Sequence, residues 1–198
     1  MKNLQYPLSF TFKITTFSND FIVKDNNGMV VSYIKQKMFR FIEDINIYSD
    51  ETKSQLNYNI KADRWLDFSA VYSMTNHAGL YLGKIARKGW SSLWKARYEI
   101  YDENNAQDLI IHEENAWIKV LDGLLCEIPI IGMVSGYFFN PSYIISRQDG
   151  TAVARLKKEP SFWGRKFTLN TLNKFETGEE ERLVLGLMMM ILLERRRG

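Results

Sequence analysis

The chain has 198 residues, of which 45% are hydrophobic and 25% charged, a composition typical of one globular domain or at most two small ones. Its net charge of +3 permits contact with anionic lipid or nucleic acid without requiring it. A single cysteine, Cys126, excludes an intramolecular disulfide framework and indicates a reducing compartment.

Most of the chain is predicted to be β-strand. Phe10, Phe12 and Ile14 alternate with polar residues, as in a strand with one buried face. A unit of strand, Asp/Asn/Gly turn and returning strand then recurs, and a last strand covers Phe167–Leu172. Together these elements predict ten to twelve strands. The five hairpins cover residues 21–34, 45–60, 71–82, 98–111 and 143–156, with turns at Asp25–Gly28, Asp50, Asn76–Gly79, Asp102–Asn105 and Asp149–Gly150.

One short amphipathic helix is predicted to interrupt the strands near 115–125. Trp117, Val120 and Leu124 lie on one helical face there, while Lys119 and Asp122 lie elsewhere. No linker, low-complexity tract or charge block marks a domain boundary. We therefore expect residues 1–198 to form a single domain.

A second helix is predicted at the C-terminus, over about 179–195. Leu183–Leu193 contains no polar residue, so a helix there is apolar on every side and belongs inside a core or a membrane. Eleven residues rise only about 16 Å, too short for a hydrocarbon core of about 30 Å. Thr177 and Glu180 fit a capping box, and Glu179–Glu181 lie at the positive end of the helix dipole.

These two sets of elements predict one architecture. Many antiparallel hairpins remove their edges by closing into a barrel, and a barrel of about twelve strands is too wide for its own side chains to fill. The apolar C-terminal helix would fill it. We therefore predict a mainly β protein: a closed antiparallel barrel of about 12 strands around a buried hydrophobic helix.

Hairpins of the type Asp25–Gly28 followed by a terminal hydrophobic helix resemble the tubby C-terminal-like superfamily, and within it the phospholipid scramblase and LURP-one-related families. The resemblance implies a twelve-stranded barrel around the C-terminal helix. For function it implies phosphoinositide binding in the tubby branch, lipid movement between leaflets in the scramblase branch, and an undefined role in the LURP-one branch. It covers nearly the whole chain and is carried by Phe21–Ile34, Tyr98–Ile111, Asn140–Tyr143 and Leu183–Leu193.

The sequence departs from animal scramblases in three places. Their acidic calcium-binding segment before the last helix is replaced by the basic segment Ser161–Leu169, whereas calcium requires several oxygen ligands. The cysteine cluster used for palmitoylation and a proline-rich N-terminal arm are also absent. We therefore expect no cofactor and no control by calcium, and a reader or scaffold rather than an acylated scramblase.

The first candidate site is the segment Lys84–Arg97, which interleaves cations with two tryptophans. On a membrane the indoles would lie at the headgroup level and the cations against anionic lipid. The alternative is an ordinary loop and strand with tryptophans packed inward and cations in solvent. The candidate lipid-contacting residues are Lys84, Arg87, Lys88, Trp90, Trp94 and Lys95.

A second basic cluster surrounds Pro160 and Trp163. Lysine and arginine could hold phosphate oxygens there, or could form a solvated edge that discourages sheet aggregation. The candidate residues are Arg155, Lys157, Lys158, Arg165 and Lys166.

No other residue group predicts chemistry. The oxygen-rich segment Asp102–Asp108 lacks the glycine and bidentate glutamate of an EF-hand and is predicted to be a turn. His77 and His112 fit no zinc motif, and no nucleophile elbow is present. We therefore predict no catalytic residue, no metal site and no enzymatic activity.

The sequence predicts a non-catalytic module that associates with lipid or a membrane surface and binds anionic phospholipid headgroups. The alternative is a cytosolic scaffold that binds protein partners and has no lipid affinity. Nucleic acid is not an expected partner, because the basic residues form no continuous stripe. Residues 1–14 lack the apolar run of a signal peptide and no stretch spans a membrane, so we expect a cytoplasmic protein, peripheral at the inner membrane face.

Overall fold

The computed structural model describes residues 4–14, 18–37, 44–64, 70–88, 97–114, 141–160 and 166–195. These segments form twelve strands and one long helix, in the order that the sequence patterns predict. The bounds are β1 Leu8–Ile14, β2 Ser18–Lys24, β3 Val30–Lys37, β4 Asp44–Tyr48, β5 Leu56–Arg64, β6 Val71–Asn76, β7 Tyr81–Lys88, β8 Arg97–Tyr101, β9 Gln107–Glu113, β10 Ser142–Arg147, β11 Ala152–Lys158, β12 Lys166–Thr171 and α3 Glu179–Arg195.

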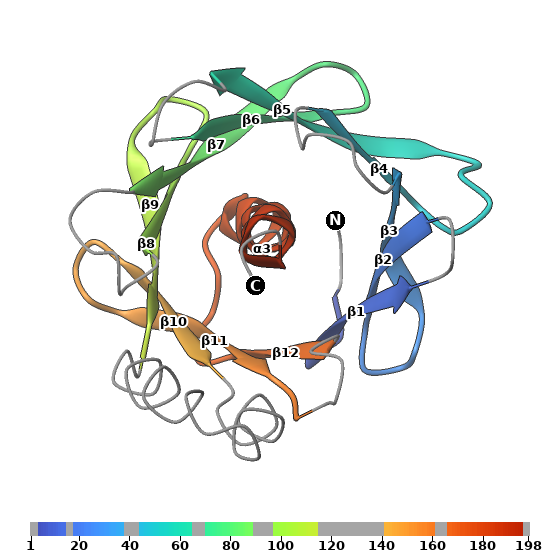
Figure 1. The fold of residues 1–198 in the computed structure, drawn as a ribbon. Helices are drawn as coiled ribbons and strands as arrows, with labels where there is room; N and C mark the ends of the chain where they lie inside the picture. The colour runs from blue at the N-terminus through green and yellow to red at the C-terminus, as the bar shows by residue number, and fades with distance from the viewer. Residues whose placement is uncertain are drawn as a thin grey trace, which may run out of the picture.

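The strands form one closed antiparallel barrel around α3 (Figure 1). Each strand pairs with its neighbours in sequence, and β1 closes the ring against β12 with Leu8 opposite Leu169. Closure pairs the first strand with the last, so neither is left as an exposed edge. The predicted fold class is confirmed, whereas the amphipathic helix predicted near 115–125 lies outside the described residues.

Three of the hairpin turns share one local mechanism. The side-chain oxygen of Asp25 accepts hydrogen bonds from the backbone N–H groups of Asn27 and Met29, both at 2.9 Å. Asn76 and Asp102 make the same pair of bonds two and four residues ahead. Three residues after each of these side chains the backbone has positive φ, which favours glycine or asparagine: Gly28, Gly79 and Asn105. The repeated turn chemistry therefore fixes the strand connections.

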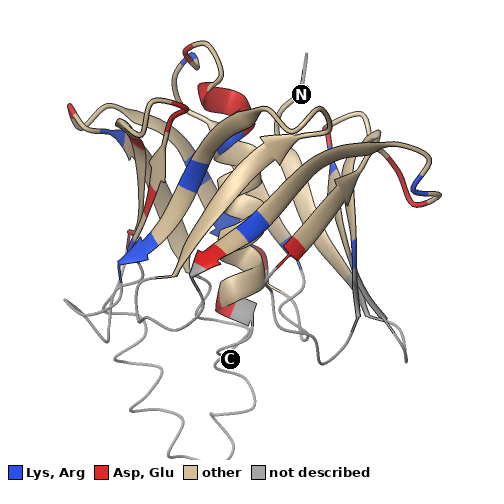
Figure 2. Ribbon diagram, turned by 90° about the horizontal axis from the view of Figure 1, so that it is seen from above, with Lys and Arg blue, Asp and Glu red and all other residues tan. Residues whose placement is uncertain are grey.

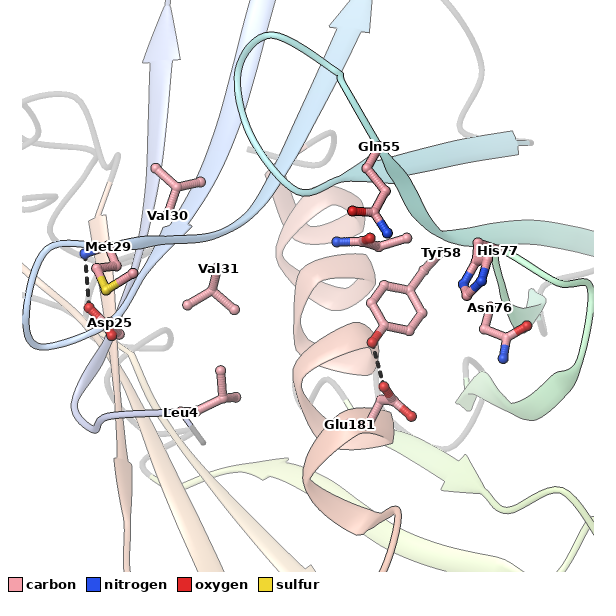
Figure 3. A pocket seen from close by; sticks show the side chains of 11 residues that line it. Leu4, Asp25, Met29, Val30, Val31, Gln55, Tyr58, Asn76, His77 and Glu181 are labelled. Atoms are coloured by element: carbon pink, nitrogen blue, oxygen red, sulfur yellow. Dashed lines mark hydrogen bonds between the residues drawn. The ribbon is translucent and has the colours of Figure 1, made fainter. Parts of the chain in front are cut away.

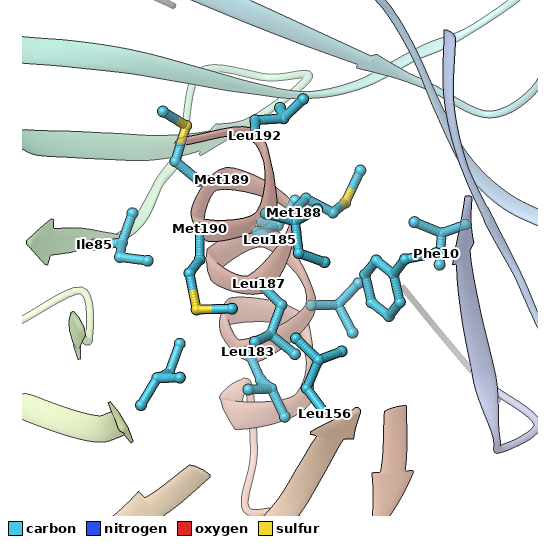
Figure 4. Close-up of a cluster of buried hydrophobic side chains, with 14 of the residues drawn as sticks. Phe10, Ile85, Leu156, Leu183, Leu185, Leu187, Met188, Met189, Met190 and Leu192 are labelled. Atoms are coloured by element: carbon cyan, nitrogen blue, oxygen red, sulfur yellow. The ribbon is translucent and has the colours of Figure 1, made fainter. Parts of the chain in front are cut away.

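The core lies between the barrel wall and the helix. Leu183–Leu185 and Leu187–Leu192 are at most 2% exposed. They face different parts of the wall, including Phe10 of β1, Ile85 of β7 and Leu156 of β11 (Figure 4). The helix approaches β7 and β8 most closely at Gly186, where an added Cβ would lie 2.6 Å from Ile100 Cδ1. A helix without a polar face is thus buried on all sides, as its sequence predicts.

The two ends of the barrel differ (Figure 2). We call one the turn end, which comprises the hairpin turns and the start of the helix: residues 25–29, 49–55, 76–80, 102–108, 147–151 and 172–182. We call the other the base, where the odd-numbered strands and α3 end. Among the described residues, no helix is long and apolar enough to cross a membrane.

The start of the helix differs from the predicted capping box in one detail. The predicted pair was Thr177 with Glu180. In the structure the carboxylate of Glu179 accepts a hydrogen bond from the Glu176 backbone N–H at 2.8 Å, while Glu180 accepts one from Tyr6 Oη at 3.1 Å. The reciprocal bond of a capping box therefore lies one residue earlier, because Glu180 is turned toward the N-terminal segment.

Candidate functional site

The first predicted basic cluster divides between the two faces of β7. Lys84 and Lys88 lie on the outer face, where each has a partner on β8. Lys88 Nζ lies 3.3 Å from Glu99 Oε2, which raises the pKa of Lys88, and Lys84 Nζ lies 5.1 Å from the centre of the Tyr101 ring. Glu99 also pairs with Arg97 at 3.1 Å. Part of the positive charge on this face is therefore neutralised within the barrel wall.

Arg87 points toward the helix instead. It lies two residues after the buried Ile85, and its side chain is only 16% exposed. Its Nε lies 4.0 Å from Glu194 Oε1, and its guanidinium lies 5.9 Å from the Tyr98 ring. Tyr98 Oη donates to Glu194 at 2.5 Å, and burial together with this carboxylate raises the pKa of Tyr98. Arg87 therefore secures the end of α3 and is poorly placed for an outside ligand.

The second predicted cluster comes together on the outer face of β11 and β12. Arg155 and Lys157 alternate with the buried Leu156, and all three pair with β12. Lys157 is opposite Thr168, so Lys166 is its diagonal neighbour on the same face, about 7–8 Å away by strand geometry. Lys157 and Lys166 are both exposed, whereas Arg155 binds Glu114 at 2.9 Å.

The remaining predicted residues are placed as follows. Lys158 ends β11 and is half-buried, on the opposite face of the strand from Lys157. Trp90, Trp94, Lys95 and Arg165 lie outside the described residues. Strands β8, β9 and β10 separate the two clusters, so β7 and β11 are four strand spacings apart, or roughly 19 Å along the wall. The described cations therefore form two patches near the base.

The helix start binds the barrel on several sides at the turn end. Arg147 of β10 donates from Nε and Nη2 to the carboxylate of Glu179 at 2.8 and 2.7 Å. Arg182 donates to Asp108 at 2.6 Å and to Glu103 at 2.9 Å. Burial raises the pKa of Asp108 although Arg182 opposes the shift. Tyr58 of β5 donates to Glu181. Four consecutive helix residues, counting Glu180 with Tyr6, therefore fix the rotation and depth of α3.

Charge is unequally divided between the turn end and the rest of the chain. The turn end contains eleven Asp and Glu but only four Lys and Arg, a net charge of −7. The described residues outside the turn end contain fifteen Lys and Arg and eight Asp and Glu, a net charge of +7. Charge separation on this scale produces a long-range field that orients the molecule near a charged surface. The mild net charge of the whole chain conceals it.

The described residues contain no group of three or more His, Cys, Asp or Glu side chains placed to hold a metal ion. Sequence reasoning missed Glu99 and Glu114 as partners of predicted lipid-contacting cations. For Glu99 a signal existed, because it follows Arg97 by two residues in a strand and so shares its face. Glu114 reaches Arg155 across β10, and only the sheet order reveals that contact.

A closed twelve-stranded barrel around a buried C-terminal helix defines a protein of the tubby-like fold class. The chain belongs to the LURP-one-related family, whose sequence profile matches residues 30–191, about four fifths of its length. The match begins at β3 and ends within α3, so it includes most of the barrel and the helix that fills it. No match was found among curated proteins.

Proposed function

We propose that this protein is a non-catalytic module that associates with membrane surfaces by binding anionic phospholipid headgroups. The base of the barrel and the outer face of β11 and β12 form the contact surface, and the turn end faces away from the membrane. The contact requires no cofactor and no calcium. It places the protein at the inner face of a membrane.

The separation of charge is the observation that supports this proposal. Each Lys or Arg near an anionic leaflet contributes about 1 kcal/mol, and the attraction decays within a Debye length. A net charge of +7 on the described residues outside the turn end is enough for such binding, while the −7 at the turn end disfavours the opposite orientation. Lys157 and Lys166 are the best-placed described residues, because both are exposed on one face.

Binding to vesicles of defined composition tests the proposal. The purified protein is sedimented with vesicles of neutral phosphatidylcholine, with vesicles that also contain phosphatidylserine, and with vesicles that contain a phosphoinositide, each at low and moderate salt. We expect sedimentation with both anionic preparations, weakened by salt, and none with the neutral one. Equal sedimentation with neutral and anionic vesicles, or none with any, would contradict the proposal.

A difference between the two anionic preparations would identify the headgroup. At equal vesicle charge, a protein that responds only to the overall negative charge of the surface sediments equally with both anionic preparations. A stronger response to the phosphoinositide would indicate that side chains hold its phosphate oxygens directly. Movement of lipid between leaflets is a separate property, to be measured with a fluorescent lipid once binding is established.

A further inference from the structure

A pocket of about 540 Å³ opens at the turn end, away from the proposed membrane contact (Figure 3). It lies between the β2–β3 hairpin, the start of β5 and the β6–β7 turn, and Glu181 of α3 also lines it. Its size falls within the range of sites that hold a small ligand. A ligand here would be bound whether or not the base contacts a membrane.

Two walls of different character face each other across this pocket. Leu4, Met29, Val30 and Val31 form an apolar wall, whereas β5 and the β6–β7 turn contribute uncharged polar side chains (Figure 3). A β-bulge lies in each wall, since the strand register leaves Val31 of β3 and Asn57 of β5 without a cross-strand partner. A bulge changes the direction of its side chains, and both bulged residues line the pocket.

Hydrogen bonds within the fold hold both walls in place. Asp25 Oδ1 accepts hydrogen bonds from the backbone of its own turn, and Asn76 Oδ1 does the same in the β6–β7 turn. Between the walls, Tyr58 donates to Glu181. A ligand would therefore meet a largely preformed site and avoid much of the entropic cost of ordering it.

Three further polar side chains of the lining are available to a ligand. Within the described part of the chain, the side chains of Gln55, Asn57 and His77 make no hydrogen bond to another residue. A carboxamide both donates and accepts hydrogen bonds, and so does a neutral imidazole. They therefore suit an uncharged ligand with several groups that both donate and accept, as hydroxyl groups do.

The surroundings of the pocket disfavour other classes of ligand. None of the described lining residues is Lys or Arg, and the turn end has a net charge of −7, so a phosphate or carboxylate would be repelled. Asp25 and Glu181 already accept hydrogen bonds within the fold, so a cation would have to compete for them. The apolar wall is aliphatic and offers no aromatic ring on which a nucleobase would stack.

We propose that this pocket binds a neutral sugar unit, either a free sugar or the end unit of a glycan. A sugar carries hydroxyl groups around its ring and apolar C–H groups on its faces, which match a polar wall opposite an aliphatic one. The hydroxyl groups would bind Gln55, Asn57 and His77. The C–H face of the ring would pack on Val30 and Val31.

Saturation-transfer-difference NMR of the full-length chain tests the proposal with the methyl glycosides of glucose, galactose, mannose, xylose and N-acetylglucosamine. Uridine and butylamine represent the other ligand classes. We expect saturation transfer to at least one glycoside, which is then titrated by calorimetry, and weaker binding of uridine and butylamine. An oligosaccharide that ends in the same unit is titrated in parallel. Tighter binding of the oligosaccharide would assign a glycan as the source of the sugar, and equal binding a free sugar.

Two variants and a matched control locate the binding. Asn57→Ala and Gln55→Ala should each lower the affinity for the glycoside about fivefold, the effect of losing one neutral hydrogen bond. Asn59→Ala is the control, because this amide on the same strand donates to Asp44 and Asn46 outside the pocket, and it should bind like the unmodified chain. The proposal is overturned if no glycoside binds, if uridine or butylamine binds more tightly than every glycoside, or if both pocket variants bind like Asn59→Ala.

Discussion

At the scale of single residues, Glu179 shows how this barrel tolerates a charge at the edge of its core. Its carboxylate is 1% exposed, and it accepts two hydrogen bonds from Arg147 and one from the Glu176 backbone. A buried carboxylate is costly unless its oxygens are bound by donors or paired with a cation. The ion pair of Arg147 and Glu179 therefore joins the start of α3 to β10. Loss of both charges should destabilise the fold less than loss of the cation alone.

Replacing Arg147 with methionine tests this ion pair. Arg147→Met removes the cation and leaves a buried carboxylate, so we expect the free energy of unfolding to fall by about 3 kcal/mol. Urea unfolding followed by circular dichroism measures the loss. Adding Glu179→Gln to Arg147→Met should recover part of it. A double variant whose loss equals the sum of the two single losses would show that the pair is not coupled.

At the scale of elements, α3 supplies the inner side of the core. The barrel side chains that face it include Phe10, Ile85 and Leu156, and among the described residues the helix is the largest apolar surface that they pack against. A chain without this helix would expose the apolar lining of the barrel to water, at a cost of about 25 cal/mol for each Å². The helix is therefore required for the fold itself.

Deleting Glu179–Gly198 should consequently prevent folding. We expect the truncated chain to be insoluble, or to unfold without a cooperative transition in circular dichroism and calorimetry. A graded comparison accompanies it: Leu187→Asp should be severely destabilising, whereas the volume-conserving Leu187→Met should cost less than about 1.5 kcal/mol. A truncated protein that is soluble and unfolds cooperatively would contradict the central position of the helix in the core.

Sequence patterns predicted the elements well because each depends on local chemistry. Alternating residues such as Ile45 and Ile47, and turns initiated by Asp25 or Asn76, identify strands from a few neighbouring positions. The length and uniform apolarity of Leu183–Leu193 predict a central helix in the same way. The misplaced capping pair reflects a tertiary contact, because Tyr6 hydrogen-bonds Glu180 from the other end of the chain.

The candidate sites were harder to predict, since they depend on which strands lie together. The inward direction of Arg87 could have been read from its spacing to Ile85. In contrast, the pocket unites Leu4, Asp25, Gln55, Asn76 and Glu181, which no local pattern connects. The charge separation likewise becomes visible only once the turns and the helix start are known to share one end.

At the scale of the whole molecule, four buried or partly buried tyrosines predict its response to alkaline pH. Burial raises the pKa of Tyr6, Tyr58, Tyr98 and Tyr143, and nearby carboxylates add to each shift. The folded state therefore retains protons that the unfolded state loses above about pH 10. This stabilisation is complete below pH 10 and declines as pH rises further, by up to about 1.4 kcal/mol per pH unit for each fully buried phenol.

We accordingly expect the free energy of unfolding to change little from tyrosine ionisation up to about pH 10 and to fall steeply above it. Denaturant unfolding at several pH values, with tyrosinate absorbance recorded in parallel, measures both quantities. Tyr98→Phe removes one titrating group and should make the decline shallower. Ionisation of all tyrosines near pH 10 in a barrel that stays folded would contradict the expected shifts.

Also at this scale, we propose that the molecule is oriented, with a basic surface toward the membrane and an acidic turn end away from it. If vesicle affinity depended on net charge alone, every lysine would contribute to it equally, wherever the lysine lies in the molecule. Two double variants with the same change of charge separate these views. Lys157→Glu/Lys166→Glu changes the proposed contact face, and Lys24→Glu/Lys174→Glu changes exposed lysines at or beside the turn end.

The decisive measurement is cosedimentation of these two variants with vesicles that contain phosphatidylserine. We predict that Lys157→Glu/Lys166→Glu lowers the vesicle affinity about 30-fold or more, from the loss of two contacts of about 1 kcal/mol each and the added repulsion. Lys24→Glu/Lys174→Glu should stay close to the unmodified protein. Equal losses in both variants would contradict an oriented contact, and unchanged binding of the first would remove β11 and β12 from the membrane surface.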